Sequence, residues 1–281
     1  MEPIIVFAVL AAAIMHASWN ALIKTGLDKF LSISMMSLFM GLLALLALPF
    51  VPFPDQYTWM WIIISAVLHT GYKLFLIRAY AAGDLSQVYP LARGTAPLIT
   101  AFASFALLGE HLGTFTIAGI FVLCAGVWLM CVQGGMGVKK LDKPAIAYAL
   151  GTSLFIAAYT ITDGIGGRGA TSVTSYTMWM FALDAVIMMT VCLSVRGINA
   201  VPSMMSEWKS GLIAAALSVC AYWIVIWAMT QAPIAAVAAL RETSVLAALL
   251  ISVVVLKEKV NLWRIWAAIT ILAGVVLLRT G

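Results

Sequence analysis

Charged side chains are scarce in this chain of 281 residues. Asp, Glu, Lys and Arg make up 10% of them, 64% are hydrophobic, and the mean hydropathy is +1.07. Soluble domains carry roughly 25% charged residues, and a soluble fold of this length has no core large enough to bury so much apolar surface. The composition excludes a soluble globular protein and indicates that a lipid bilayer surrounds the chain.

The small excess of basic residues does not point to nucleic acid. Lys and Arg number 16 against 11 for Asp and Glu, which gives a net charge of +5. In a membrane protein such an excess is typical of cytoplasmic loops. We therefore expect a bilayer and a small molecule as partners, and no nucleic acid.

Cysteine motifs and catalytic signatures are also missing. The four cysteines lie within apolar runs, none in a CxxC pair, and we expect them to be small packing residues. The sequence contains no Walker loop, HExxH motif or Ser–His–Asp arrangement, so it suggests neither ATP nor a metal, and we expect no cofactor. A membrane enzyme is disfavoured because the loops are short and carry no recognisable nucleophile.

Ten apolar stretches of about 20 residues, each long enough to cross the hydrocarbon core as a helix, follow one another along the chain. The predicted fold is therefore an all-α integral membrane protein. The expected spans are 3–23, 31–52, 58–82, 87–108, 113–133, 143–163, 171–195, 208–231, 234–256 and 262–279.

The chain repeats itself at half its length. Leu107–Met130 and Val255–Leu278 both run from an acidic turn into an apolar helix that carries AG-V near its end. An offset of 148 residues aligns Glu110 with Glu258, Gly126 with Gly274 and Arg93 with Arg241. A half-length repeat in an apolar chain is typical of transporters built from two related halves.

The polar, Gly-rich segment at 133–144, QGGMGVKKLDKP, divides the chain into 1–138 and 139–281, with five expected helices in each part. Because five is an odd number, the second half enters the membrane with the opposite orientation. We therefore expect two inverted five-helix repeats, with the site near the midplane where the halves meet.

Basic residues predict the orientation. The odd-numbered connections carry eleven Lys and Arg residues, whereas the other side carries only Arg168 and Arg279. This bias predicts a multi-pass inner-membrane protein whose termini are both non-cytoplasmic. The eleven are Lys24, Lys29, Arg78, Lys139, Lys140, Lys143, Arg196, Lys209, Lys257, Lys259 and Arg264.

The stretches LGEHLGTFTIAGIFVLCAG and LKEKVNLWRIWAAITILAG, each closing one half, resemble the EamA family of the drug/metabolite transporter superfamily. The resemblance covers essentially the whole chain and implies two EamA five-helix repeats, at 1–138 and 139–281. It implies transport but names no cargo, because the family carries amino acids, nucleotide precursors, sugars and drugs.

A narrower likeness lies in HASWNALIK at 16–24, which is similar to a subgroup that opens with a His-Ala-x-Trp-Asn-Ala motif. Some of that subgroup are associated with phosphonate use. The second half departs from this motif, since its equivalent stretch, IAAYTITDG at 156–164, has no His or Asn.

Seven ionisable residues lie within the expected spans, where such groups are expensive and tend to face a cavity. Arg93 and Arg241 offer planar forks for carboxylate or phosphonate oxygens. The alternative is that these arginines form structural bridges with Glu242 or Asp184, or that Arg93 snorkels. The seven are His16, His69, Lys73, Arg93, Asp184, Arg241 and Glu242.

We expect a cavity lined by the first, third, fourth, sixth, eighth and ninth helices, with Pro90 and Pro97 interrupting the fourth. His69 and Lys73 add positive potential there. Aromatic residues pack on apolar parts of the cargo or on an alkylammonium group. With Asn20 and Tyr89, the remaining expected cargo contacts are Trp19, Tyr72, Tyr159, Tyr222, Trp223 and Trp227.

Three residues compete for a role in proton coupling. Glu242 is favoured because it adjoins the proposed anion site, and Asp184 and His16 are the alternatives. His16 has a plainer interpretation as a helix-packing residue that bonds Asn20 or a backbone carbonyl. Glu110 and Glu258 are expected to cap the fifth and tenth helices.

The sequence as a whole predicts a secondary transporter of a small polar metabolite, anionic or zwitterionic, phosphonate-like or amino-acid-like, with proton coupling. The alternative is an exporter of cationic or aromatic compounds. A non-transporting sensor is disfavoured because neither terminus offers a signalling tail. Ten helices suffice to enclose a pathway in one chain, so a monomer or a homodimer is expected.

Overall fold

The computed structural model describes residues 1–24, 28–83, 85–134, 142–254 and 262–280. Within these ranges every regular element is helical. The first half contains α1 (Pro3–Lys24), α2 (Lys29–Ala47), the 3-10 turn η1 (Leu48–Phe50), α3 (Gln56–Ala82), α4 (Leu85–Leu108) and α5 (Thr114–Gly134). The second half contains α6 (Lys143–Gly169), α7 (Val173–Arg196), α8 (Ala200–Met205), α9 (Trp208–Gln231), α10 (Ile234–Arg241), α11 (Ser244–Val254) and α12 (Leu262–Thr280).

The long helices have the length and composition of membrane spans. Nine helical segments of the described residues are long and apolar enough to cross a bilayer, and Thr114–Met130 is a shorter apolar helix. The chain is therefore a multi-pass membrane protein with nine or ten apolar helices. Glu258, Lys139, Lys140, Lys257 and Lys259, which the sequence analysis used, lie outside the described residues.

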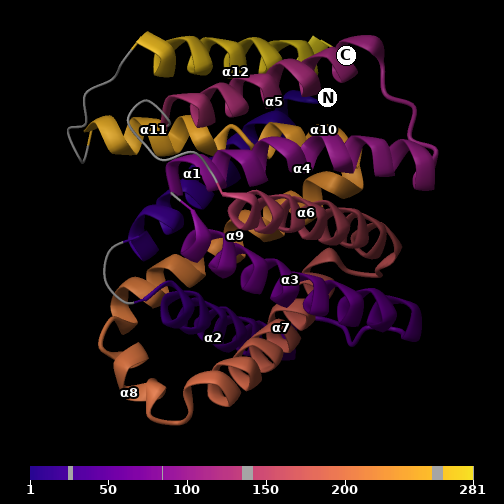
Figure 1. The fold of residues 1–281 in the computed structure, drawn as a ribbon. Coiled ribbons are helices and arrows are strands. Elements are labelled where there is room, and N and C mark those ends of the chain that lie inside the picture. Colours follow the sequence, from indigo (N-terminus) through magenta and orange to yellow (C-terminus); the bar gives the residue numbers. More distant parts are fainter. Residues whose placement is uncertain (25–27, 84, 135–141, 255–261, 281) are drawn as a thin grey trace.

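Equivalent helices of the two halves make equivalent contacts. α3 packs against α6 as α9 packs against α1, while α2 meets α7 and α5 meets α12. The layered bundle places α5 and α12 along one edge and α2 and α7 toward the other, and both termini lie at the same end (Figure 1). The division at 138/139 falls outside the described residues.

The broken helix is in the second half rather than the first. We expected Pro90 and Pro97 to interrupt the fourth helix, but α4 continues through both. α4 packs against both α5 and α6, and these contacts offset the two hydrogen bonds that the prolines remove. The expected span 234–256 is instead split after Arg241, because the amide of Thr243 bonds the carbonyl of Leu240 in a tight turn.

The sixth helix is longer than its predicted end at residue 163. α6 continues to Gly169 through the glycines that follow residue 163. A Cβ at Gly164 would lie 2.2 Å from the side chain of Ile234, and one at Gly166 would lie 2.4 Å from the ring of Tyr176. These glycines therefore allow close helix contacts, and the longer helix places Asp163 inside the bundle.

Glu110 caps a different helix from the one expected. Its carboxylate accepts a hydrogen bond from the amide of Ile234 at 3.1 Å, at the start of α10, instead of capping α5. It also pairs with Arg168 at 2.7 Å, and Arg168 donates to the carbonyls of Met229 and Ala232 at the end of α9. Glu110 therefore joins the two halves at the end of the bundle that carries the termini.

Aspartates cap two helices of the first half. Asp28 accepts from the amide of Leu31 at the start of α2, and Asp55 accepts from the amide of Thr58 at the start of α3. Hydrogen bonding by Thr58 holds the pKa of the exposed Asp55 carboxyl below its ordinary value. Both caps satisfy amide donors that the helix leaves free.

Small residues allow α5 and α12 to approach closely. A Cβ at Gly126 would lie 2.7 Å from the side chain and 2.9 Å from the backbone nitrogen of Ile271, and one at Gly274 would lie 2.7 Å from the backbone nitrogen of Leu123. Backbone atoms cannot move aside as a flexible side chain can. The interface therefore needs glycine on both helices, as is typical of close packing in membranes.

We expect Gly126→Leu to lower the free energy of unfolding by about 1–3 kcal/mol or more, because overpacking forces the helices apart. The thermal midpoint of the purified protein in detergent measures this loss. Ala125→Leu is the matched control, since Ala125 is the exposed neighbour on the same helix. Equal midpoints for the two variants would contradict the close approach of α5 and α12.

Candidate functional site

A cavity of about 760 Å³ lies between the halves. It reaches from His69 and Arg241 in the interior to Leu22 and Lys29, so it extends toward the end of the bundle where α1 ends and α2 begins. The termini lie at the opposite end (Figure 1). α2 and α7 contribute to the walls together with the helices that the sequence predicted, through residues such as Met36 and Phe181.

Six charged side chains are buried around this cavity, three cations and three carboxylates. Two of the carboxylates, Asp184 and Glu242, were predicted from the sequence, and Asp163 was not. With Asp163 included, the fixed charges of the buried set balance, which is what burial in a low-dielectric interior requires. The six are Lys73, Arg93, Arg241, Asp163, Asp184 and Glu242.

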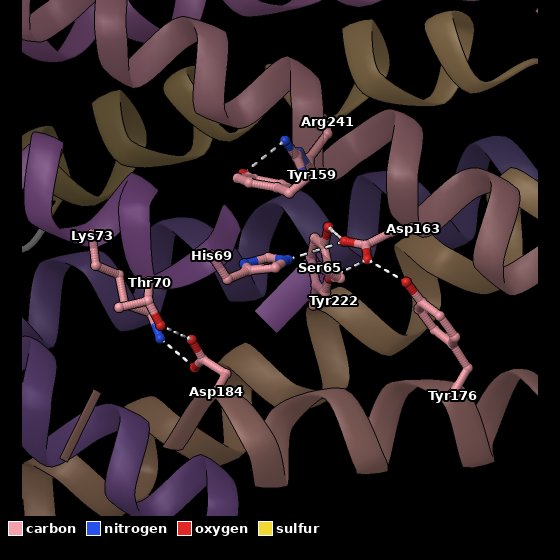
Figure 2. A network of polar contacts seen from close by, with 10 residues as sticks. All are labelled: Ser65, His69, Thr70, Lys73, Tyr159, Asp163, Tyr176, Asp184, Tyr222 and Arg241. Carbon is pink, nitrogen blue, oxygen red and sulfur yellow. Dashed lines mark hydrogen bonds and ion pairs between the residues drawn. The ribbon is translucent and has the colours of Figure 1, made fainter. Parts of the chain in front are cut away.

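The first ion pair joins Lys73 on α3 to Asp184 on α7. The Lys73 ammonium also donates to the Ser37 hydroxyl at 2.7 Å, and the Thr70 hydroxyl donates to Asp184 at 3.3 Å (Figure 2). Both charged residues line the cavity. Lys73 and Asp184 thus neutralise each other, and each also has a hydroxyl group as a hydrogen-bond partner.

The second ion pair joins Arg93 on α4 to Glu242, the residue that follows α10. Arg93 Nε lies 2.8 Å from Glu242 Oε2, and the two side chains are 2% and 1% exposed. Neither residue belongs to the cavity wall. Arg93 therefore forms the structural bridge with Glu242 that was the alternative to cargo binding.

Asp163 on α6 holds the third buried negative charge. It accepts hydrogen bonds from Ser65, Tyr176 and Tyr222, and His69 Nε2 lies 3.0 Å from its Oδ2 (Figure 2). Four neutral or titratable groups thus surround this carboxylate. Among the described residues no Lys or Arg pairs with it.

Arg241, at the end of α10, is the buried cation that has no oppositely charged partner among the described residues, as Asp163 has no Lys or Arg. Its Nη2 lies 3.5 Å from the Tyr159 hydroxyl, and its Cζ lies 5.8 Å and 5.9 Å from the ring centroids of Tyr159 and Tyr222. No carboxylate of the described residues lies within ion-pair distance, and the buried Nε has no hydrogen-bond partner. Arg241 lines the cavity and therefore presents a buried positive charge to it.

The structure separates the other predicted contact residues into two groups. Trp19, Asn20, Tyr72, Tyr89 and Tyr159 line the cavity, as do His16 and Tyr222. Two do not belong to the wall: Trp223 is 41% exposed and donates to the Thr174 hydroxyl, and Trp227 packs against an apolar cluster. Trp223 and Trp227 therefore lie outside the lining of this cavity, on other faces of α9.

Two roles were considered for His16 and Asn20 on α1, helix packing and contact with the cargo, and their surroundings are compatible with both. The amide of Asn20 donates to the carbonyl of His16 at 2.9 Å, and the His16 ring packs edge-on to Trp19 at 4.9 Å. These local contacts agree with a helix-packing role. All three residues nevertheless line the cavity, so they remain available to cargo.

Asp163 is the functional candidate that sequence reasoning missed, although its partners His69 and Tyr222 were singled out. A single signal was present, because the stretch IAAYTITDG carries an aspartate at the end of an expected membrane span. The predicted span ended at this aspartate, before the glycines that follow, so Asp163 was not counted among the ionisable residues of the interior. Its donors come from α3, α7 and α9, and no spacing in the sequence brings those helices together.

The arrangement can hold an anion at Arg241 and a proton near Asp163 and His69. A planar guanidinium with free donors suits a carboxylate or phosphonate group. Among the described residues no group of His, Cys, Asp and Glu has the geometry of a metal site.

Comparison with known proteins bears on the family and on the fold. The model of the EamA-like transporter family matches residues 3–132 and 143–280. A solved structure titled "Crystal structure of protein" is 15% identical, has a TM-score of 0.79, and is matched over 99% of this chain and 96% of its own. This likeness shows the fold alone. No curated protein matches the sequence.

Proposed function

Because the chain belongs to the EamA-like transporter family, we propose that it is a secondary active transporter of a small anionic or zwitterionic metabolite. It works by alternating access between its two halves and is coupled to protons. The observation that carries this proposal is Arg241, a buried cation that lines the cavity without a carboxylate partner among the described residues.

The charge balance of the cavity supports an anionic group on the cargo. Lys73 and Arg93 are neutralised within the protein, so an anion gains little from either. Arg241 is buried in a low-dielectric setting, where pairing with a carboxylate or phosphonate is stronger than it is in water. Of the two arginines expected to bind cargo, we therefore propose only Arg241 for this role and regard Arg93 as the structural partner of Glu242.

The likeness of HASWNALIK to its subgroup supports a phosphonate as one cargo class. His16, Trp19 and Asn20 of this motif face the same cavity as Arg241. A primary amine on the cargo has aromatic partners there, since Tyr72 and Tyr89 also line the wall. An aminophosphonate or an amino acid combines both features.

The charge bias of the connections supports an orientation for this state. The cavity reaches the end of the bundle that carries most of the basic connections. We propose that this end faces the cytoplasm of a cell bounded by an inner membrane, with both termini on the other side. One chain contains the whole cavity, so a monomer suffices and a homodimer is compatible with it.

A second candidate is an exporter of cationic or aromatic compounds. The aromatic lining favours it, because five tyrosines share the cavity with Trp19 and Phe181. The carboxylates do not favour it, because Asp184 is already neutralised by Lys73 and Asp163 does not line the cavity. The two candidates therefore differ in the charge of the ligand that binds.

Thermal stabilisation of the detergent-purified protein distinguishes them. The ligands are methylphosphonate, 2-aminoethylphosphonate, L-alanine and L-glutamate, with tetraethylammonium and an aromatic cation as the opposing set. A ligand that binds only the folded state raises the free energy of unfolding, by about 2.7 kcal/mol at 100 times its dissociation constant. The thermal midpoint therefore rises with ligand concentration.

We expect one or more of the anions or zwitterions to raise the midpoint and the cations to leave it unchanged. Stabilisation by the cations alone would contradict the proposal and favour the exporter. Stabilisation by none of the six compounds would remove the support for an anion site at Arg241.

A further inference from the structure

We propose that Asp163 and His69 form the proton-binding site of this transporter, and that a proton there and an anion at Arg241 are carried together, as in a symporter. This inference rests on the proposed function, because it presupposes the anion site. It assigns the proton to a pair other than Glu242, Asp184 and His16, the three residues that the sequence suggested.

Asp163 differs from the other two buried carboxylates in its partners. Asp184 and Glu242 each face a cation of fixed charge, Lys73 and Arg93 respectively. Protonating either carboxylate would leave that cation buried and unpaired, which is costly. Asp163 faces His69 instead, so a proton on this pair neutralises a buried negative charge and breaks no fixed ion pair.

The pair is also connected to the cavity on one side only. His69 lines the cavity, whereas Asp163 is fully buried behind it and held by the hydroxyls of Ser65, Tyr176 and Tyr222. A proton from water in the cavity therefore reaches the imidazole first. From His69 Nε2 the hydrogen bond of 3.0 Å leads directly to Asp163 Oδ2.

The proton pair and the anion site share two aromatic residues. The Tyr159 ring stacks on His69 at 4.1 Å and lies 5.8 Å from Arg241 Cζ, and Tyr222 contacts both as well (Figure 2). The distance from the centre of the His69 ring to Arg241 Cζ is therefore at most the sum of these two distances. At this separation inside the bundle, charges on the two groups interact appreciably.

The sign of this interaction determines the direction of coupling. A protonated His69 and the Arg241 guanidinium repel each other, and an anion bound to Arg241 removes that repulsion. Anion binding therefore favours the proton, and by reciprocity the proton favours the anion by the same free energy. Two ligands that favour each other travel together, whereas an antiporter needs ligands that exclude each other.

The remaining charged and titratable groups around the pair do not change this sign. The ion pairs Lys73–Asp184 and Arg93–Glu242 are internally neutral. The tyrosines are uncharged hydrogen-bonding groups at neutral pH. Tyr159 and Tyr222 contact His69, and Tyr176 and Tyr222 bond Asp163. The other titratable or charged groups nearby are Tyr72, which contacts Tyr159, Arg241, which lies over the Tyr159 ring, and His16 on α1, which lines the same cavity.

Proton uptake on anion binding tests the inference. Wild-type protein and Asp163→Asn are mixed with the four anions and zwitterions named above, in weakly buffered detergent solution that contains a pH dye. Both proteins bind the same form of the probe, so titration of the probe cancels in the difference. We expect the wild type to take up about one proton more per bound anion than the variant does.

The affinity for the same probes gives a second readout. We expect it to fall as the pH is raised in the wild type, because the proton and the anion favour each other, and to change much less in the variant. His69→Gln serves if Asp163→Asn does not fold, because it removes the imidazole and keeps a donor for Asp163. Asp142→Asn and His111→Gln, at exposed positions, are the matched controls.

The outcomes separate this inference from the proposed function. Anion binding with equal proton uptake in the wild type and both variants would overturn the proton site and leave the anion site standing. Proton release on binding would overturn symport and favour antiport. If none of the four probes stabilises the wild type, the anion site fails and the coupling fails with it.

Discussion

Arg241→Gln is expected to abolish the stabilisation that anions give to the wild-type protein. The substitution removes the guanidinium charge but keeps a donor for the Tyr159 hydroxyl, which Arg241 contacts at 3.5 Å. Losing one partner of a buried charge pair costs about 2–5 kcal/mol of binding. This corresponds to an affinity at least about thirtyfold weaker. Thermal midpoints at increasing ligand concentration measure the change.

The matched control is Arg196→Gln. Arg196 pairs with Asp28 at the surface, with half of its side chain exposed, so its loss changes the net charge equally without touching the cavity. Arg241→Lys adds a finer comparison, since Lys keeps the charge and loses the planar fork. Undiminished anion binding by Arg241→Gln would remove the central observation from the account.

Glu242→Gln and Arg93→Met are each expected to destabilise the protein strongly. Either change leaves the opposite charge buried, with 2% exposure for Arg93 and 1% for Glu242. Breaking a buried ion pair in this way costs about 3–5 kcal/mol. The measurement is the loss of the thermal midpoint, or of folded yield, relative to the wild type.

The double variant Arg93→Met/Glu242→Gln provides the control for this prediction. It removes both charges together, so we expect it to be more stable than either single variant. Such rescue would identify the pair as structural. Single variants with wild-type midpoints that lose anion binding would instead place Arg93 in the cargo site, as the sequence alone suggested.

Much of the fold is predictable from the sequence, because the bilayer imposes strict conditions on length and composition. The half-length repeat around Gly126 and Gly274 predicted two related halves, and the family match covers both. The glycines themselves lie where α5 and α12 approach most closely. Helix ends were less predictable where glycine serves packing, as at Gly164 and Gly166 in α6.

The site was predictable in its residue types and less so in its pairings. Arg241, Lys73 and His69 were singled out because ionisable residues are rare within membrane spans. Sequence spacing did not reveal that Arg93 meets Glu242 across 149 residues, or that three helices supply the partners of Asp163. Such contacts depend on how the halves pack, which no local pattern encodes.

The break after Arg241 shows the same limit. Proline in α4 gave a local reason for an interruption, yet the chain turns at Glu242 and Thr243, where no proline or glycine stands. The turn places Arg241 at the cavity and Glu242 against Arg93. Tertiary pairing thus outweighs local propensity at this position.

Uptake into proteoliposomes tests the central claim most directly. Wild-type protein and Arg241→Gln are reconstituted side by side, and uptake of the labelled anion or zwitterion that stabilises the wild type is followed with and without an inward proton gradient. The account predicts uptake by the wild type that the gradient increases, and none above empty liposomes by the variant. Equal uptake by both proteins, or flux of organic cations alone, would contradict it.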